Sequence, residues 1–238
     1  MIAIICYNIT CGVFVVTAIS TAVFTTTQKS ISIVENLLDL VSIFDKKIQI
    51  SCLSRPINKE IGYYFAQLAE QNKLMTLRFQ CVYHHQKAID WGFLPDLVGK
   101  NRLIEDIELL LDIYTELLGC QRVGFRLEVL DKAMCPRFHV DKVGVRLLCT
   151  YQGVGTQWLD DSQANRAKLG LGAQGLADEC SGLMVVNEEF GQANPFDIVL
   201  LKGASWPENE GKGAIHRSPR VDCAIQPRVL LVLDAIWN

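Results

Sequence analysis

The sequence lacks several patterns that mark common classes of site. None of its nine cysteines forms a Cys-x-x-Cys pair and their number is odd, which argues against a zinc ribbon and a disulfide framework. Lysine and arginine are scattered through a chain of net charge −3, so there is no nucleic-acid signature. The Gly-x-Gly-x-x-Gly match at 170–175 follows no strand-like run, which argues against dinucleotide binding. The candidate chemistry therefore centres on the four histidines.

The first 27 residues contain no charged side chain, and apolar residues dominate them. This length suggests a membrane span, but Asn8, Thr10 and Thr17 interrupt the run and no Lys or Arg precedes it. Two interpretations stay open, an anchor that gives membrane contact or an apolar extension outside the fold. Because the odd cysteine count favours a reducing compartment, we expect a cytoplasmic protein, with anchorage through residues 1–27 as the alternative.

Residues 28–238 are expected to form one domain of the α+β class. Apolar residues recur at helical spacing over 30–44 and again between Asn101 and Gly119, and Asn58 can cap a further helix. We therefore expect residues 28–118 to be a mostly helical support region that packs against the rest. Two short runs within it are predicted strands, 48–52 and 77–82.

After residue 118 the apolar period changes from helical to two. Strands without helices between them indicate a sandwich or barrel, so we expect residues 119–238 to form a β-barrel core. Residues 160–180 are expected to be an inserted loop or short helix. The predicted strands are 123–130, 145–151, 183–186, 198–201 and 229–233.

His139 and Asp141 form the first candidate ligand pair. Residues at i and i+2 of an extended segment point to the same face, so the two side chains would project together. His216 follows in the distant string Ala214–Pro219, and Arg228 opens the next apolar strand. Two histidines and one carboxylate on one face of iron(II) leave other coordination positions open for co-substrates.

In this order the residues resemble the iron(II)- and 2-oxoglutarate-dependent oxygenases, which share a double-stranded β-helix, a barrel of the jelly-roll type. That resemblance covers about 123–234. A second resemblance, from about Ser30 to the C-terminus, is to domain-of-unknown-function family 1826. It is carried by the strings Cys-Pro-Arg-Phe-His-Val-Asp-Lys, Leu-Leu-Cys-Thr-Tyr, Leu-Leu-Lys-Gly, Trp-Pro-Glu-Asn and His-Arg-Ser-Pro.

The oxygenase resemblance implies roles for particular residues. His139, Asp141 and His216 fall on the metal-ligand positions, which makes them the candidate catalytic residues, and Arg228 falls on the position that binds the 2-oxoglutarate carboxylate. Leu230 stands where many of these oxygenases have Ser or Thr. Four other arginines compete for the carboxylate, namely Arg126, Arg146, Arg217 and Arg220.

Other assignments stay open. Tyr151 either hydrogen-bonds the bound acid or is a half-buried strand tyrosine with another partner. The oxygenase resemblance implies a dioxygenase (a hydroxylase-type oxidoreductase) whose substrate, a small molecule or a protein, is unknown. The alternative is a β-barrel that binds or senses a divalent metal such as zinc without redox turnover, with Cys135 as a candidate additional ligand.

Overall fold

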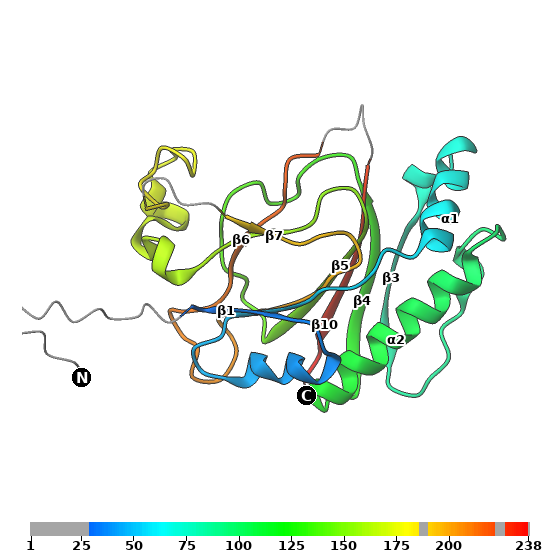
Figure 1. Cartoon of the computed structure of the whole chain (residues 1–238), viewed down its shortest axis with the longest axis horizontal. Coiled ribbons are helices and arrows are strands. Elements are labelled where there is room, and N and C mark those ends of the chain that lie inside the picture. Colours follow the sequence, from blue (N-terminus) through cyan, green and yellow to red (C-terminus); the bar gives the residue numbers. More distant parts are fainter. Residues whose placement is uncertain (1–28, 186–189, 222–226, 238) are drawn as a thin grey trace, which may run out of the picture.

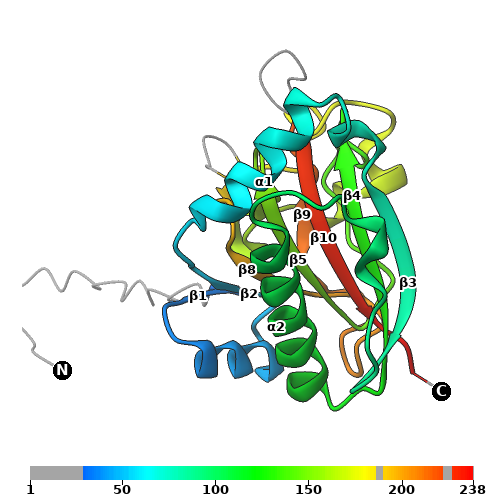
Figure 2. The same cartoon turned by 90° about the vertical axis from the view of Figure 1, so that its right-hand side faces the viewer.

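The structure is a computed structural model that describes residues 29–185, 190–221 and 227–237. A large sheet has the strand order β1-β2-β8-β5-β10-β4-β3, and a small sheet has the order β7-β6-β9. All neighbouring strands are antiparallel except β1 and β2, which are parallel. Figures 1 and 2 show the two longest helices on one side of the large sheet and the small sheet on the other. The protein is thus a mixed α and β structure in three layers.

The strands are β1 (Ile31–Val34), β2 (Ile50–Leu53), β3 (Arg78–His84), β4 (Arg122–Leu130), β5 (Val145–Gln152), β6 (Gln157–Leu159), β7 (Gly191–Gln192), β8 (Ile198–Lys202), β9 (Ile215–Arg217) and β10 (Arg228–Ala235). The α-helices are α1 (Lys59–Glu70) and α2 (Lys100–Leu118). Short 3₁₀ helices are η1 (Leu37–Phe44), η2 (Leu74–Thr76), η3 (Trp91–Phe93), η4 (Asp161–Gln163), η5 (Arg166–Lys168) and η6 (Gly170–Ala173).

The ends of the two α-helices follow from local chemistry. The Asn58 side chain accepts hydrogen bonds from the backbone nitrogens of Glu60 and Ile61, which satisfies two free donors at the start of α1. Helix α2 ends at Gly119, whose φ of 63° lies in the left-handed region that glycine adopts readily. Both helix boundaries confirm the sequence-based expectation.

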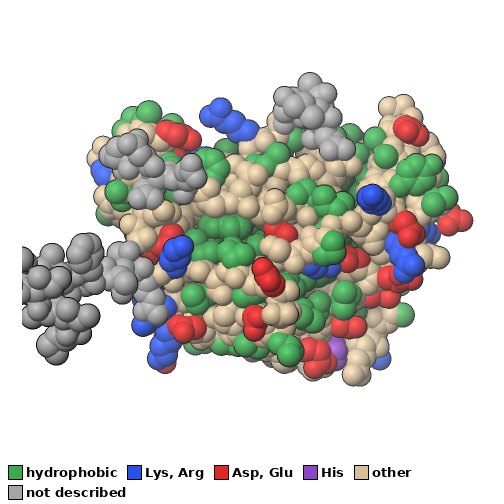
Figure 3. Space-filling model, viewed as in Figure 1, with side chains coloured by type: hydrophobic (Ala, Val, Ile, Leu, Met, Phe, Trp, Pro, Cys, Tyr) green, Lys and Arg blue, Asp and Glu red, His purple; other side chains and the backbone are tan. Residues whose placement is uncertain are grey.

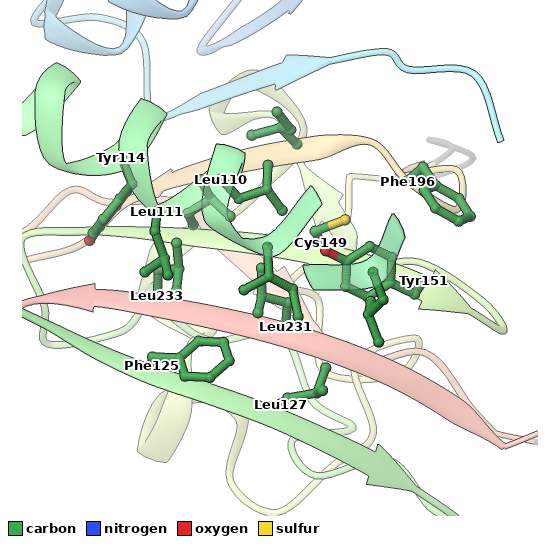
Figure 4. Packing of buried hydrophobic residues seen from close by; sticks show 14 of the residues in the cluster. Leu110, Leu111, Tyr114, Phe125, Leu127, Cys149, Tyr151, Phe196, Leu231 and Leu233 are labelled. Atoms are coloured by element: carbon green, nitrogen blue, oxygen red, sulfur yellow. The ribbon is translucent and has the colours of Figure 1, made fainter. Parts of the chain in front are cut away.

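Strand alternation separates the two faces of the large sheet. Figure 4 shows Phe125 and Leu127 of β4 beside Leu231 and Leu233 of β10, under the buried face of α2. Residues one position along each strand point to the small sheet instead. The space between the two sheets is lined partly by apolar residues, among them Leu148, Trp158, Val199, Leu230 and Val232.

Two sequence-based expectations for local structure are wrong. Residues 30–44 form β1 and then η1 rather than one helix, because the β-branched Ile31–Val34 segment pairs with β2 at the sheet edge. Of the predicted strand 183–186, the described part makes only one isolated bridge, from Met184 to Ala164. The region 28–118 also supplies three strands of the large sheet, so it does more than support a separate barrel.

The expectations for residues 1–27 lie outside the described residues. Within the described parts of the chain, no helix is both long enough and apolar enough to cross a membrane. On the face seen in Figure 3, acidic and basic side chains are interspersed rather than gathered by sign.

Candidate metal centre

A backbone bridge brings the two candidate histidines together. His216 lies in the middle of β9, and the backbone nitrogens of His139 and His216 each donate to the other residue's carbonyl oxygen over 3.0 Å. Partners in such an antiparallel pair project to the same side. Their rings accordingly lie 4.5 Å apart between centroids.

A backbone carbonyl oxygen orients each imidazole through its Nδ1. Nδ1 of His139 lies 2.9 Å from the carbonyl oxygen of Arg137, and Nδ1 of His216 lies 3.0 Å from that of Ala214. A carbonyl can only accept, so in the neutral ring each Nδ1 carries the proton and donates it. This tautomer leaves Nε2 of both rings with a free lone pair, the form needed to bind a metal.

Asp141 completes the cluster. Its Oδ1 lies 3.3 Å from Nε2 of His139, and its Oδ2 lies 3.3 Å from Nε2 of His216. One ligand atom from each of the three residues lies within 4.8 Å of the other two. Two imidazole nitrogens and one carboxylate oxygen that converge in this way fit a divalent transition metal.

The electrostatics of the cluster favour a charged carboxylate. Burial raises the pKa of Asp141, but hydrogen bonds from the protonated forms of both histidines and the charges of His216 and Arg146 hold it well below its usual range. Burial lowers the pKa of His139, yet the hydrogen bonds to Asp141 and Arg137 and the Asp141 charge outweigh this, so the pKa is raised. Asp141 is therefore an anionic candidate metal ligand at neutral pH.

Arg146 of β5 fixes the Asp141 carboxylate from the other side. Its Nη1 donates to Asp141 Oδ2 over 2.6 Å, while its Nε and Nη2 donate to both oxygens of Asp234 over 2.7 and 2.8 Å. Arg126 of β4 also pairs with Asp234. A chain of ion pairs thus connects the cluster to the large sheet and restrains Asp141.

Arg228 opens β10 and lines the same cavity of about 90 Å³ as the triad. Its side chain is fully buried, and Nη2 donates to the hydroxyls of Thr150 and Thr156 over 3.0 and 2.8 Å. Its Nε has no partner, and none of the described carboxylates forms an ion pair with it. Burial accordingly lowers the pKa of Arg228 to about 10.

The other four candidate arginines differ from Arg228. Arg126 and Arg146 have the carboxylate partners given above, and Arg217 pairs with Asp178 and lies over the ring of Phe138. Arg220 is exposed. Within the described residues, Arg228 alone of the five combines full burial with an unpaired charge.

The structure does not bring Tyr151 to this cavity. Tyr151 points to the helix side of β5, as Figure 4 shows, and its hydroxyl donates to Asp106 Oδ2 over 2.8 Å. The placement follows from strand alternation, because Arg146, Leu148 and Thr150 face the cavity and residue 151 must face away. The suggested role for Tyr151 at the bound acid is therefore wrong. Cys135 lines the cavity but is not part of the convergent set.

Four polar residues around this cavity were not predicted from the sequence: Glu128, Thr150, Thr156 and Asp234. A signal was present, because charged side chains recur at alternate positions of otherwise apolar strands, such as Arg126 and Glu128 in β4. Such residues must lie on one face of the sheet. Thr150 pairs with Leu230 across β5 and β10. Leu230 stands where many of the similar oxygenases have Ser or Thr, so Thr150 supplies a hydroxyl next to that position.

The fold and the cluster together describe a two-sheet protein with a candidate metal site between its sheets. The chain belongs to a family of proteins of unknown function, DUF1826, whose model matches residues 35–234. This confirms the expected family. No curated protein matches the chain.

Several solved structures are similar to the chain at low identity. The dioxygenase for auxin oxidation from rice is 14% identical, with 87% of this chain and 83% of that chain covered and a TM-score of 0.48. A Pseudomonas putida prolyl-4-hydroxylase is 11% identical, with 85% and 100% covered and a TM-score of 0.42. HygX from Streptomyces hygroscopicus, with nickel and 2-oxoglutarate bound, is 12% identical, with 84% and 86% covered and a TM-score of 0.41. Similarities of this size do not transfer a function.

Proposed function

We propose that the protein is an iron(II)- and 2-oxoglutarate-dependent oxygenase. The observation that carries the proposal is that His139, Asp141 and His216 converge in one cavity with the buried guanidinium of Arg228, which pairs with no carboxylate of the described residues. A metal triad alone fits many metalloproteins, whereas an unpaired buried cation beside it fits an anionic co-ligand. The proposal extends to the fold, in which the two sheets would be the halves of a double-stranded β-helix.

The proposal assigns a role to each of these residues. Nε2 of His139, Nε2 of His216 and a carboxylate oxygen of Asp141 would hold the metal, with Arg146 restraining that carboxylate. Arg228 would bind the far carboxylate of 2-oxoglutarate through its unpartnered Nε.

Two threonines position Arg228 for this role. Thr150 and Thr156 hold the Arg228 guanidinium in place through their hydroxyls. Bound iron(II) with 2-oxoglutarate would supply the chemistry, the conversion of dioxygen and the co-substrate to succinate and carbon dioxide with hydroxylation of a substrate C–H bond.

A non-redox protein that holds zinc is the second candidate. It uses the same three ligands, and the small volume of the cavity, about 90 Å³, favours it. The two candidates differ in what Arg228 does, because a zinc-storage or sensing site has no need of an unpaired buried arginine. Binding of 2-oxoglutarate to the metal-loaded protein therefore separates them.

The cellular setting is also proposed rather than observed. We propose a cytoplasmic protein, for which the odd cysteine count is the support. Membrane anchorage through residues 1–27 is the alternative.

The test is to mix anaerobic protein with iron(II) and 2-oxoglutarate, record the visible absorption band of the chelated co-substrate, and then add oxygen and measure succinate. We expect the band and slow succinate formation even without substrate, and the loss of both in His216→Ala. His84→Ala is the matched control, since His84 is exposed on β3. Folded protein that binds iron but shows neither band nor succinate would contradict the proposal.

A further inference from the structure

Glu128 is a second unsatisfied charged group in the cavity of the candidate metal centre. It lies on β4, lines the same cavity as the triad and Arg228, and is only 4% exposed. Its Oε2 has no hydrogen-bond partner. Its Oε1 accepts one hydrogen bond, from Nη2 of Arg78 over 3.2 Å.

The one cation that contacts Glu128 compensates it poorly. The Arg78 side chain is 75% exposed, so water and salt screen its charge. A buried carboxylate is costly unless its oxygens are hydrogen-bonded and its charge is paired. Glu128 therefore retains the capacity to accept a further hydrogen bond from a cationic donor.

Arg228 is near Glu128 on the sheet and does not pair with it. Leu230 faces Glu128 across β10 and β4, and Arg228 faces Leu130, so Arg228 and Glu128 are diagonal neighbours. Two long side chains in this relation can reach each other. Yet Arg228 donates to two threonines, and burial is the one cause that shifts its pKa. Among the described residues, this cavity thus presents a positive group without a carboxylate partner and an incompletely paired negative group.

We infer that Glu128 binds a cationic nitrogen group of the substrate, an ammonium or a guanidinium. The inference rests on the proposed function, in which the 2-oxoglutarate carboxylate occupies Arg228 and leaves Glu128 to face the substrate. A cationic donor supplies the hydrogen bond that Oε2 lacks and compensates the charge that Arg78 compensates only partly. A substrate carboxylate or phosphate would be repelled by Glu128, so the site selects for basic substrates.

The test compares cationic probes with neutral ones of the same shape. The full chain loaded with zinc is titrated by calorimetry with butylammonium against 1-butanol, and with butylguanidinium against butylurea. We expect each cation to bind at least about tenfold tighter than its neutral counterpart, as a charge-assisted hydrogen bond exceeds a neutral one. Glu128→Gln keeps the shape of the side chain and abolishes this difference.

Two further variants sharpen the result. Arg78→Gln removes the partial compensation and tightens cation binding, the opposite direction to Glu128→Gln. Glu116→Gln removes one negative charge from an α2 side chain that is 76% exposed, and leaves probe binding unchanged. Equal binding of cationic and neutral probes, or undiminished cation binding by Glu128→Gln, overturns the inference.

The same samples are titrated with 2-oxoglutarate, so that the two proposals fail separately. Glu128→Gln should not weaken 2-oxoglutarate binding, because Arg228 is intact and the substitution removes a negative charge from the same cavity. If 2-oxoglutarate does not bind while the cations bind through Glu128, the proposed function fails and the cation site stands. If 2-oxoglutarate binds and the cations do not, the cation site fails alone.

Discussion

Arg228→Met gives an unusual combination of effects if Arg228 binds a co-substrate. The pKa of Arg228 falls from 12.5 to about 10, which corresponds to about 3 kcal/mol by which burial disfavours the charge. The substitution removes that cost and loses two hydrogen bonds to threonine hydroxyls, each contributing about 1.5 kcal/mol because the donor is charged. We therefore expect the free energy of unfolding without ligands to change by no more than about 1 kcal/mol, or to rise. Replacement of most large buried residues costs more than this.

The same substitution should abolish binding of the acid. Removing one partner of a buried charge pair costs about 3–5 kcal/mol, so the affinity for 2-oxoglutarate should fall by a factor of at least about 100. Urea denaturation measures the first effect, and calorimetry on the manganese-loaded protein measures the second. Arg126→Met is the control, because Arg126 already pairs with Asp234 and its loss should affect the acid far less. Loss of more than about 3 kcal/mol of stability with unchanged 2-oxoglutarate affinity would refute this reasoning and make Arg228 a structural residue.

Three further predictions follow from individual contacts. Tyr151→Phe should lower the free energy of unfolding by about 1 kcal/mol through loss of the Asp106 hydrogen bond, and should leave metal and 2-oxoglutarate binding unchanged in calorimetry; weaker binding would restore Tyr151 to the site. Gly203→Ala should weaken both stability and metal affinity, since a Cβ there would collide with the carbonyl oxygens of Asp141 and Val143; unaltered metal affinity would show that this segment does not position Asp141. Burial lowers the pKa of Lys202 from 10.5 to about 8, so the unfolded chain binds more protons between these values and stability contributed by this group rises with pH from about 8 to 10.5. In urea denaturation, the free energy of unfolding of wild type relative to that of Lys202→Met should therefore increase between pH 7 and pH 10. A constant difference would contradict the lowered pKa.

The sequence predicted elements whose signals are local. Asn58 and Gly119 mark helix ends through their own side-chain and backbone preferences. The apolar stripe of α2 can be recognised from its spacing alone, without knowledge of a distant partner. Residues 30–44 were predicted wrongly because pairing with β2, a non-local contact, decides the structure of Ile31–Val34. Local spacing alone does not contain that information.

The site was predictable to a similar extent. The i, i+2 spacing of His139 and Asp141 holds their side chains together whatever lies elsewhere, but His216 enters through a bridge between segments far apart in the chain. Tyr151 was misassigned although Arg146 and Thr150 on the same strand already set the alternation. Glu128 was missed because an unsatisfied carboxylate oxygen is visible only when its surroundings are known.

A titration with cobalt(II), followed by its visible absorption, tests the central claim most directly. Wild type should bind one equivalent, and its spectrum should change when 2-oxoglutarate is added. His216→Ala should lose the spectrum, while His84→Ala should keep it. Unchanged cobalt binding by His216→Ala would contradict the claim that His139, Asp141 and His216 hold one metal.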